Sequence, residues 1–176
     1  MKQKPPLVIH VNSEDDFVRA CQKYENVYNI YAGLNERSTG GTTGIEVKSV
    51  KTIAIDIDPI RSNGIKDDPT TESELQHAYD VAQAIMVWLY DKFLVDPIIA
   101  MSGNGVQLYV SVPKLDFTEA NRKKTEQKLQ LFQKEIAERF STSMAKIDNI
   151  GDLPRIIKVI GTKSIKGSPT NERPHR

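Results

Sequence analysis

The sequence predicts an α+β fold in which helices pack against one face of a largely antiparallel sheet. Strand-like and helical segments follow one another in mixed order, without the regular alternation that a parallel sheet requires. The turn Gly103-Asn-Gly105 joins two apolar segments, which is typical of an antiparallel hairpin. Two long segments carry apolar residues at helical spacing, so helices are available to cover the sheet.

The expected strands are short and rich in apolar or β-branched residues, and they cover 7–11, 27–32, 50–57, 97–101, 106–112 and 156–160. The strand over 50–57 has the clearest pattern and ends at Pro59. The segments 33–44, 61–70 and 161–176 are rich in polar residues, glycine or proline, and they are expected to be loops or irregular chain.

Three helices are expected, each from a polar residue placed where a helix begins. Ser13 with Asp16 begins the first helix, and Thr71 with Glu74 forms a capping box for a long helix that ends near residue 93. The third helix is expected to begin with caps at 116 and 119 and to run to about residue 140.

Length and composition favour one domain over 1–176, with two small lobes over 1–48 and 49–176 as the alternative. Hydrophobic residues make up 39% of the chain and charged residues 27%, as in an ordinary globular protein. No apolar run is long enough to span a bilayer, so no membrane partner and a cytoplasmic, intracellular location are expected. The single Cys21 excludes an internal disulfide, and with three histidines in the chain no zinc site is expected.

Charge is unevenly distributed, although the net charge is only +1. Between 56 and 96 there are nine acidic and three basic residues, whereas between 155 and 176 there are six basic residues and one acidic residue. An acidic middle and a basic end could meet in one site that binds metal ions and phosphate groups. Two solvated surfaces would give the same pattern.

The strongest chemical signal is the pair Asp56 and Asp58 at the end of an apolar strand. Residues two apart in a strand face the same side of the sheet, so the two carboxylates would repel each other there. A divalent cation such as Mg²⁺ or Mn²⁺ would compensate, because these ions prefer oxygen ligands. A plain strand end followed by a turn explains this pair equally well. Asp148 is a third candidate carboxylate, although its neighbours alone indicate only a loop.

Two glycine-containing turns carry residues suited to phosphate binding. In one, Ser102 and Asn104 surround Gly103, and glycines let backbone N–H groups approach a phosphate closely. In the other, Gly161 is followed by Thr162 and Lys163, and Arg155 lies on the strand before it. A hairpin turn that needs a positive φ is the commoner use of such glycines. The chain has no Walker A loop, dinucleotide fingerprint, serine nucleophile elbow or H-E-x-x-H motif.

Several of these segments match one family when they are taken in chain order. They are Asn29-Ile-Tyr-Ala-Gly-Leu-Asn-Glu-Arg37, Ile53-Ala-Ile-Asp-Ile-Asp58, Ser102-Gly-Asn-Gly-Val-Gln-Leu-Tyr109, Asp148 with Leu153-Pro-Arg-Ile-Ile-Lys-Val-Ile-Gly-Thr-Lys163, and Glu172-Arg-Pro-His-Arg176. Together they resemble the archaeo-eukaryotic primase superfamily, especially the small primase–polymerases of plasmids, phages and CRISPR-associated systems. Each motif alone is weak, and the order and spacing of the set carry the resemblance, which spans roughly residues 27–176.

The resemblance implies an RRM-like primase catalytic core that performs template-dependent nucleotidyl transfer, as a DNA primase, a DNA polymerase or both. It implies that Asp56, Asp58 and Asp148 hold two Mg²⁺ or Mn²⁺ ions. Nucleotide-binding residues would be Ser102, Asn104, Gln107, Arg155, Thr162 and Lys163. Candidate contacts to template or nucleotide are Asn35, Arg37, Lys166 and His175. The implied partners are a single-stranded or primed DNA template, nucleoside triphosphates, and further domains such as a helicase or a helical primase domain.

One position departs from the family pattern. Gln107 stands where the second motif usually has a histidine that contacts the triphosphate, and glutamine can donate a hydrogen bond but carries no charge. Gln107 therefore keeps open a non-catalytic nucleic-acid-binding replication domain that retains the fold. A metal-dependent nuclease is a further alternative, because clustered aspartates also serve phosphodiester hydrolysis.

Overall fold

The computed structural model describes residues 7–38, 40–61 and 67–176. Its main unit is a four-stranded antiparallel sheet with the strand order β3-β4-β2-β5. The elements of this unit follow one another along the chain as β2 (Ser49–Pro59), α2 (Glu72–Phe93), β3 (Ile98–Met101), β4 (Val106–Asp116), α3 (Glu119–Phe140) and β5 (Ala145–Asp148). This β-α-β-β-α-β order is a split β-α-β arrangement, because the strand that follows each helix lies one strand away from the strand before it.

Strand β2 lies inside this sheet and divides its two faces by alternation. Ile55 and Ile57 are fully buried among core residues contributed by α2, β4 and β5. Asp56 lies between these two isoleucines and Asp58 follows Ile57, so both aspartates point to the other face of the sheet. The same strand therefore supplies both the hydrophobic core and two carboxylates.

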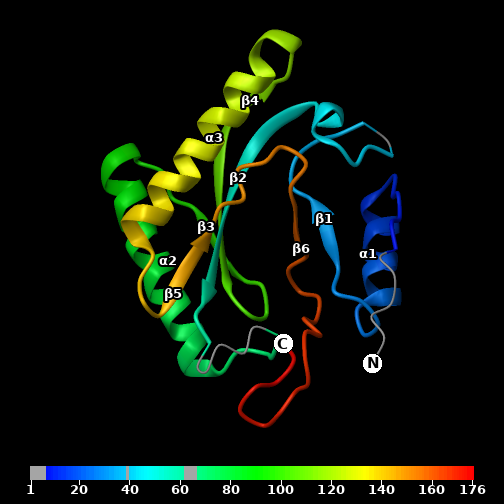
Figure 1. The fold of residues 1–176 in the computed structure, drawn as a ribbon. Helices are drawn as coiled ribbons and strands as arrows, with labels where there is room; N and C mark the ends of the chain where they lie inside the picture. The colour runs from blue at the N-terminus through cyan, green and yellow to red at the C-terminus, as the bar shows by residue number, and fades with distance from the viewer. Residues whose placement is uncertain (1–6, 39, 62–66) are drawn as a thin grey trace.

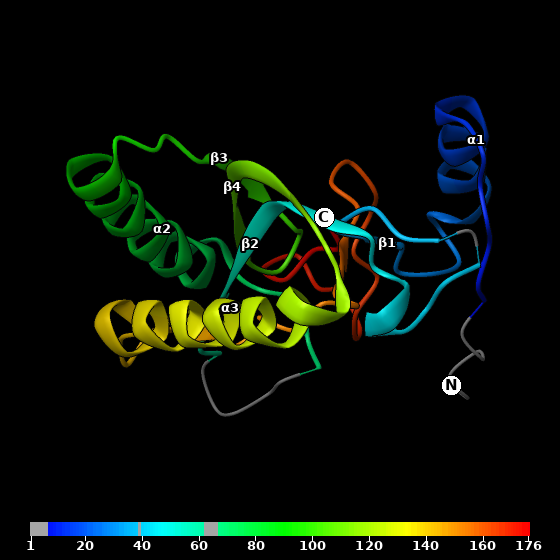
Figure 2. The same cartoon turned by 90° about the horizontal axis from the view of Figure 1, so that it is seen from above.

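Helices α2 and α3 cover one face of the sheet (Figures 1 and 2). Ala78, Ala82 and Ile85 of α2 are fully buried against it, as is Ile136 of α3. The side chain of Gln133 on α3 reaches the sheet as well, and its Nε2 donates to the carbonyl of Ala54 at 2.6 Å. That amide satisfies a β2 carbonyl next to the point where the pairing with β5 begins.

A second, two-stranded sheet lies on the opposite side of β2 from the helices, as Figure 1 shows. It pairs β1 (Tyr31–Gly33) with β6 (Ile156–Lys158) in antiparallel register. The helix α1 (Glu14–Tyr24) and the short 3₁₀ helix Gly44–Glu46 flank this part of the chain. The small sheet combines a strand from near each end of the sequence, so both halves of the chain contribute to it.

Most expected elements are confirmed, with some changes of extent. The antiparallel α+β class, the three helices and the hairpin at Gly103-Asn-Gly105 are as predicted. The strands expected over 27–32 and 156–160 are shorter, at Tyr31–Gly33 and Ile156–Lys158, whereas β4 extends to Asp116.

Three sequence-based expectations are wrong. Residues 7–11 form no strand, and the strand β5 was not expected at all. The cap of α3 is Thr118, whose hydroxyl accepts from the backbone N–H of Asn121, and not the acidic pair expected there. Half of the loop expected over 61–70, residues 62–66, lies outside the described residues.

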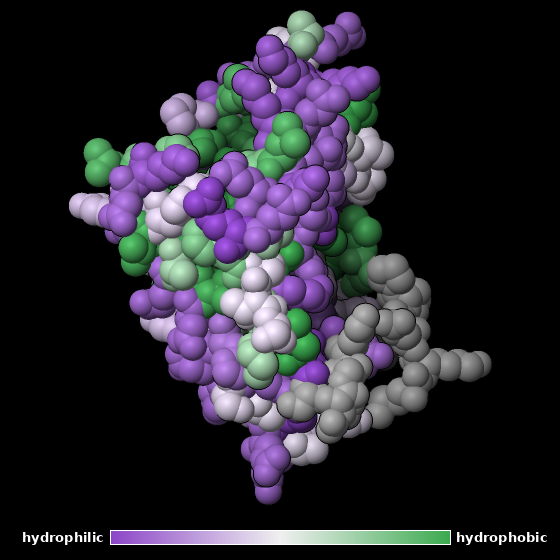
Figure 3. Space-filling model, turned by 60° about the vertical axis from the view of Figure 1, so that its left-hand side comes forward, coloured by the Kyte–Doolittle hydropathy of each residue, from purple (hydrophilic) through white to green (hydrophobic). Residues whose placement is uncertain are grey.

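The surface on the helical side is mainly hydrophilic, with separate apolar side chains among the polar ones (Figure 3). Val87 and Tyr90 are exposed members of α2, and Leu94, which caps the end of that helix, is exposed as well. Across the described ranges, no helix combines the length and apolarity that are needed to cross a bilayer.

The core described above predicts unequal effects for two valines of α2. Val81 is 6% exposed in the core, whereas Val87 is 60% exposed. Val81→Ala should lower the free energy of unfolding by about 2 kcal/mol, since it removes two buried carbon groups and leaves a cavity. Val87→Ala should change it by less than about 0.5 kcal/mol. Urea denaturation followed by circular dichroism measures both, and equal losses would contradict the assignment of the buried face.

Candidate functional site

The register of β2 with β5 brings the predicted acidic residues onto one face of the sheet. Asp56 lies directly opposite Asp148, and Asp58 lies opposite Lys146. Side chains of directly opposite residues share a face, and so do residues two apart. The three carboxylates therefore share the face that points away from the helices.

Burial and mutual repulsion act on these carboxylates. The pKa of Asp56 is raised to about 6, first by burial and then by the charge of Asp58, and a hydrogen bond from Gln107 partly opposes the shift. The pKa of Asp58 is also raised, by burial first and then by the charge of Asp148. The site thus concentrates negative charge where water screens it poorly.

Lys146 supplies part of the compensating charge, since its ammonium group donates to the carboxylate of Asp148. Among the described residues, no three His, Cys, Asp or Glu side chains form a group that could hold a metal ion as they stand. The donor chemistry nevertheless suits Mg²⁺ or Mn²⁺, which prefer carboxylate oxygens. Asp56 and Asp58 are the residues best placed to hold such an ion, and Asp148 would join them by releasing Lys146.

A cleft of about 200 Å³ lies over Asp56 and Asp58, between the open face of the main sheet and the small sheet. Cationic side chains line it together with the two carboxylates: Arg61, Arg155, Lys158 and Lys166. Arg155 lies near Asp56 and lowers its pKa, whereas Arg61 and Lys166 act in the same way on Asp58. Cations therefore stand near both carboxylates, an arrangement suited to an anionic ligand that bridges metal ions.

Most of the side chains that line the cleft are polar or charged. Ile150 and Ile157 also line it, but they pack with Ala54 of β2 and are only 8% and 9% exposed. Ser102 and Asn104 contribute a hydroxyl and an amide from the turn whose Gly105 lies against Asp58. The cleft therefore offers a ligand mainly polar and charged groups.

The turn after β3 approaches Asp58 closely because it contains glycine. A Cβ atom on Gly105 would lie 2.8 Å from Oδ1 of Asp58 and 2.6 Å from the carbonyl oxygen of Ile57. Gly103 has a φ of +96°, which glycine adopts without strain. Within this turn, Ser102 donates to the carbonyl of Gly105 at 3.1 Å. The glycines thus serve both the hairpin and the approach to the carboxylate.

Gln107 lies opposite Asp56 in the register of β2 with β4, on the same face as the carboxylates. It is 2% exposed, and its neighbours Val106 and Leu108 point into the core, as alternation predicts. Its Nε2 donates to Oδ1 of Asp56 at 3.2 Å, and its Oε1 accepts from the hydroxyl of Tyr109 at 2.7 Å. Tyr109, Gln107 and Asp56 therefore form a continuous hydrogen-bonded chain.

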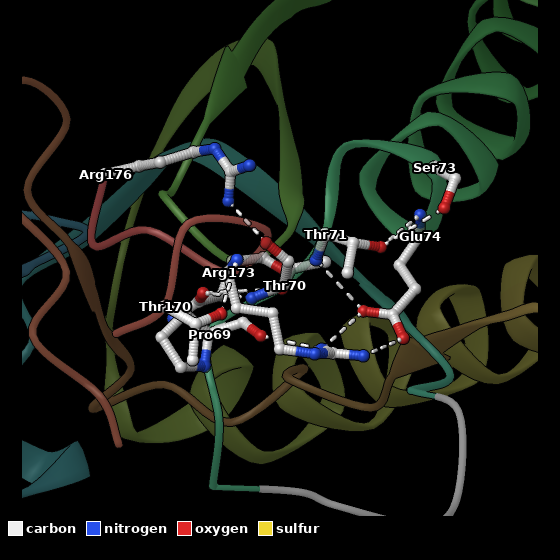
Figure 4. A network of polar contacts seen from close by, with 9 residues as sticks. Pro69, Thr70, Thr71, Ser73, Glu74, Thr170, Arg173 and Arg176 are labelled. Atoms are coloured by element: carbon white, nitrogen blue, oxygen red, sulfur yellow. Dashed lines mark hydrogen bonds and ion pairs between the residues drawn. The ribbon is translucent and has the colours of Figure 1, made fainter. Parts of the chain in front are cut away.

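The irregular C-terminal segment is held against the start of α2, as Figure 4 shows. Arg173 donates to both carboxylate oxygens of Glu74, at 2.8 and 2.7 Å. The amide of Asn104 donates to the hydroxyl of Ser164 at 2.8 Å. These contacts fix the segment that carries Ser164 and Lys166 into the cleft lining.

Other predicted residues lie away from the carboxylates. Thr162 and Lys163 line a separate, wider hollow, which they share with Gly103. Asn35 instead bridges to the backbone of β2, since its Oδ1 accepts from the N–H of Thr52 at 3.1 Å and its Nδ2 donates to the same residue's carbonyl at 2.9 Å.

Arg37 and His175 also contact backbone atoms. Arg37 donates to the carbonyls of Pro154 and Arg155, at 3.4 and 3.3 Å, so it supports the chain before β6. The ring Nε2 of His175 lies 3.2 Å from the carbonyl oxygen of Lys166. Neither side chain lines the cleft, and both hold segments that do.

Several cleft residues were not among the predicted site residues, including Tyr31, Arg61 and Lys158. Burial raises the pKa of Tyr31, as do the charges of Asp56 and Asp58. Lys158 is 6% exposed and donates to the carbonyl of Thr162 at 2.7 Å, and burial lowers its pKa. A sequence signal existed for Arg61, because it follows Asp58 by three residues, after the proline that ends the strand.

Comparison of the chain with protein-family models gave no match. Comparisons with curated proteins and with solved structures likewise found none. The function of the chain is therefore inferred from the residues of the cleft.

The electrostatics predict that removing one carboxylate stabilises the metal-free protein. Asp56→Asn and Asp58→Asn should each raise the thermal midpoint, because each removes a charge whose burial and repulsion oppose folding. Asp96→Asn, at an exposed position outside the cleft, is the matched control and should change it little. Differential scanning fluorimetry in the presence of EDTA measures all three. A lower midpoint in both cleft variants would contradict the proposed repulsion.

Proposed function

We propose that this chain is a metal-dependent nucleotidyltransferase that extends a nucleic-acid strand on a template, as a DNA primase or polymerase does. The observation that carries the proposal is the register of β2 with β5. It sets Asp56 opposite Asp148, with Asp58 two residues on, on the face that a cationic cleft overlies. The β-α-β-β-α-β order of the main unit also supports the RRM-like core that the sequence resemblance implies.

Mg²⁺ or Mn²⁺ ions bound at such a site would lower the pKa of an attacking hydroxyl and stabilise charge on the transferred phosphoryl group. The protein's part is to hold and orient the reactants. Asp56 and Asp58, with Asp148 once it is free of Lys146, supply the oxygen ligands. Their repulsion in the absence of a cation favours binding of one.

The cations of the cleft are assigned to phosphate groups. Arg61 and Lys166 stand near Asp58, and the Nε of Arg61 is buried without a hydrogen-bond partner among the described residues. A phosphate oxygen would satisfy that donor and gain a charge-assisted hydrogen bond. Arg155 stands near Asp56 and also pairs with Asp152, which orients its guanidinium group.

A nucleoside triphosphate suits the charge of the cleft, because its phosphates match the side chains of Arg61, Lys166 and Ser102. In addition to Gln107, the pairing of Lys146 with Asp148 favours the non-catalytic alternative. Internal neutralisation of that kind would allow a binding module to keep the carboxylates without a metal.

Primer extension tests the proposal. The full chain should extend a labelled primer on a DNA template with Mn²⁺ and nucleoside triphosphates, and Asp56→Ala should abolish extension while keeping the circular dichroism spectrum. Binding of the primed template without extension would favour the non-catalytic module. Shortening of the primer would favour the nuclease. Full extension by Asp56→Ala would contradict the proposed role of the carboxylates.

Arg155 and Lys163 were both expected to bind the nucleotide, but they line different hollows. Arg155→Ala should raise the KM for nucleotide by about 10-fold or more, because one charge-assisted hydrogen bond contributes about 1.5–3 kcal/mol. Lys163→Ala should raise it much less, since Lys163 lines the separate hollow. Steady-state extension at varied nucleotide concentration measures both. A larger effect at Lys163 would place the phosphates in that hollow instead.

A further inference from the structure

The resemblance to the primase superfamily implies that Gln107 contacts the nucleotide, yet both polar atoms of its side chain already have protein partners. Its side chain is 2% exposed. Nε2 is engaged with Asp56 at 3.2 Å and Oε1 with Tyr109 at 2.7 Å. Both polar atoms of the amide therefore have a protein partner, and the near-complete burial of the side chain leaves its second N–H little access to a ligand in the cleft.

The arrangement around Gln107 determines which end of its amide faces the carboxylate. Tyr109 lies two residues further along β4, on the same face, and its pKa is raised to about 12, chiefly by burial. Its hydroxyl therefore keeps its proton at neutral pH and donates to Oε1 of Gln107. The NH₂ group is then directed at Asp56, whose ionised carboxylate can only accept.

The backbone beneath these side chains is fixed as well. Gln107 pairs with Asp56 across β2 and β4, and with Ala100 across β3 and β4. Val106 and Leu108 on either side of it are buried in the core. One oxygen of Asp56 is therefore held by a donor on an interior strand, and the other oxygen remains available to a ligand in the cleft.

We propose that Gln107 is a positioning residue, which orients the carboxylate of Asp56 toward a divalent cation and does not itself contact the nucleotide. Tyr109 holds Gln107 in turn. The inference rests on the proposed function, because it assigns Asp56 to a metal. Partners of this kind orient metal ligands, and their loss typically weakens metal binding by about 10–100-fold.

Mn²⁺ binding to the full chain, followed by electron paramagnetic resonance of the free ion, tests this assignment. Gln107→Leu should weaken binding by about 10-fold or more. Tyr109→Phe should weaken it less, because the amide remains but loses its anchor. The double variant should bind no more weakly than Gln107→Leu alone, since the two residues act in series.

Gln133→Leu is the matched control. Gln133 is also a buried glutamine, 1% exposed, that donates to β2, but it approaches from the helical side. Its loss should lower stability and leave Mn²⁺ affinity unchanged. Equal losses of affinity in Gln133→Leu and Gln107→Leu would mean that any weakened core disturbs the site, and would overturn the assignment.

Nucleotide affinity separates positioning from direct contact. If Gln107 contacts a phosphate, Gln107→Leu should raise the KM for nucleotide and leave Mn²⁺ affinity unchanged, which would overturn the proposal. Tyr109→Phe, a conservative change at a partly exposed residue, keeps the test available if Gln107→Leu does not fold. Unchanged Mn²⁺ affinity in that variant would also count against the chain of contacts.

A metal-free measurement separates this inference from the proposed function. If the wild-type chain binds no Mn²⁺, the proposed function fails, but the hydrogen-bonded chain is still testable by hydrogen exchange of the Gln107 side-chain amide in NMR spectra. Exchange should be slow in the wild type and faster in both Asp56→Ala and Tyr109→Phe. Fast exchange in the wild type, or unchanged exchange in the variants, would overturn the positioning role.

Discussion

The alternation of side chains along β2 is the constraint on which the rest of the structure depends. Odd-numbered residues such as Ile55 and Ile57 are buried beneath α2 and α3, whereas Asp56 and Asp58 face the cleft. A shift of the strand by one residue would put charges into the core and isoleucines into the cleft, at a cost of many kcal/mol. The hydrophobic core therefore sets the position of the carboxylates, and it does so from the face opposite to them.

The strands β4 and β5, which pair with β2, extend this constraint to residues beyond β2. Pairing with β5 places Asp148 beside Asp56, and pairing with β4 places Gln107 on its other side. Each of these strands also has apolar residues on the helical face, so the same packing fixes the register of all three. The charges on the open face oppose folding, and the apolar burial on the other face has to offset them. A protein has reason to retain such a cluster when a ligand needs it.

Local patterns in the sequence were sufficient to predict the elements whose ends and buried faces are determined by neighbouring residues. The capping box at Thr71 and the apolar stripe after it gave the helix α2, and the alternation over 50–57 gave β2 and the shared face of its two aspartates. Strand β5 was missed although Ala145-Lys-Ile-Asp148 alternates apolar and charged residues, because four residues are too short for that alternation to stand out, and the segment becomes a strand by pairing with β2. Residues 7–11 are apolar except for His10 but remain irregular, which shows that β-propensity without a pairing partner does not make a strand. For the same reason, the positions of Lys163 and Arg61 relative to the carboxylates depended on tertiary contacts that spacing alone does not encode.

The central claim is that Asp56, Asp58 and Asp148 form one divalent-cation site. Crystals of the full chain soaked in Mn²⁺ and a non-hydrolysable nucleoside triphosphate, with data collected at the manganese edge, test it most directly. The account predicts anomalous peaks in contact with Asp56 and Asp58, about 3.5–4 Å apart where two ions bind, with Asp148 turned away from Lys146 toward them. Manganese bound elsewhere, with Asp148 still paired to Lys146 and no peak at Asp56, would contradict it.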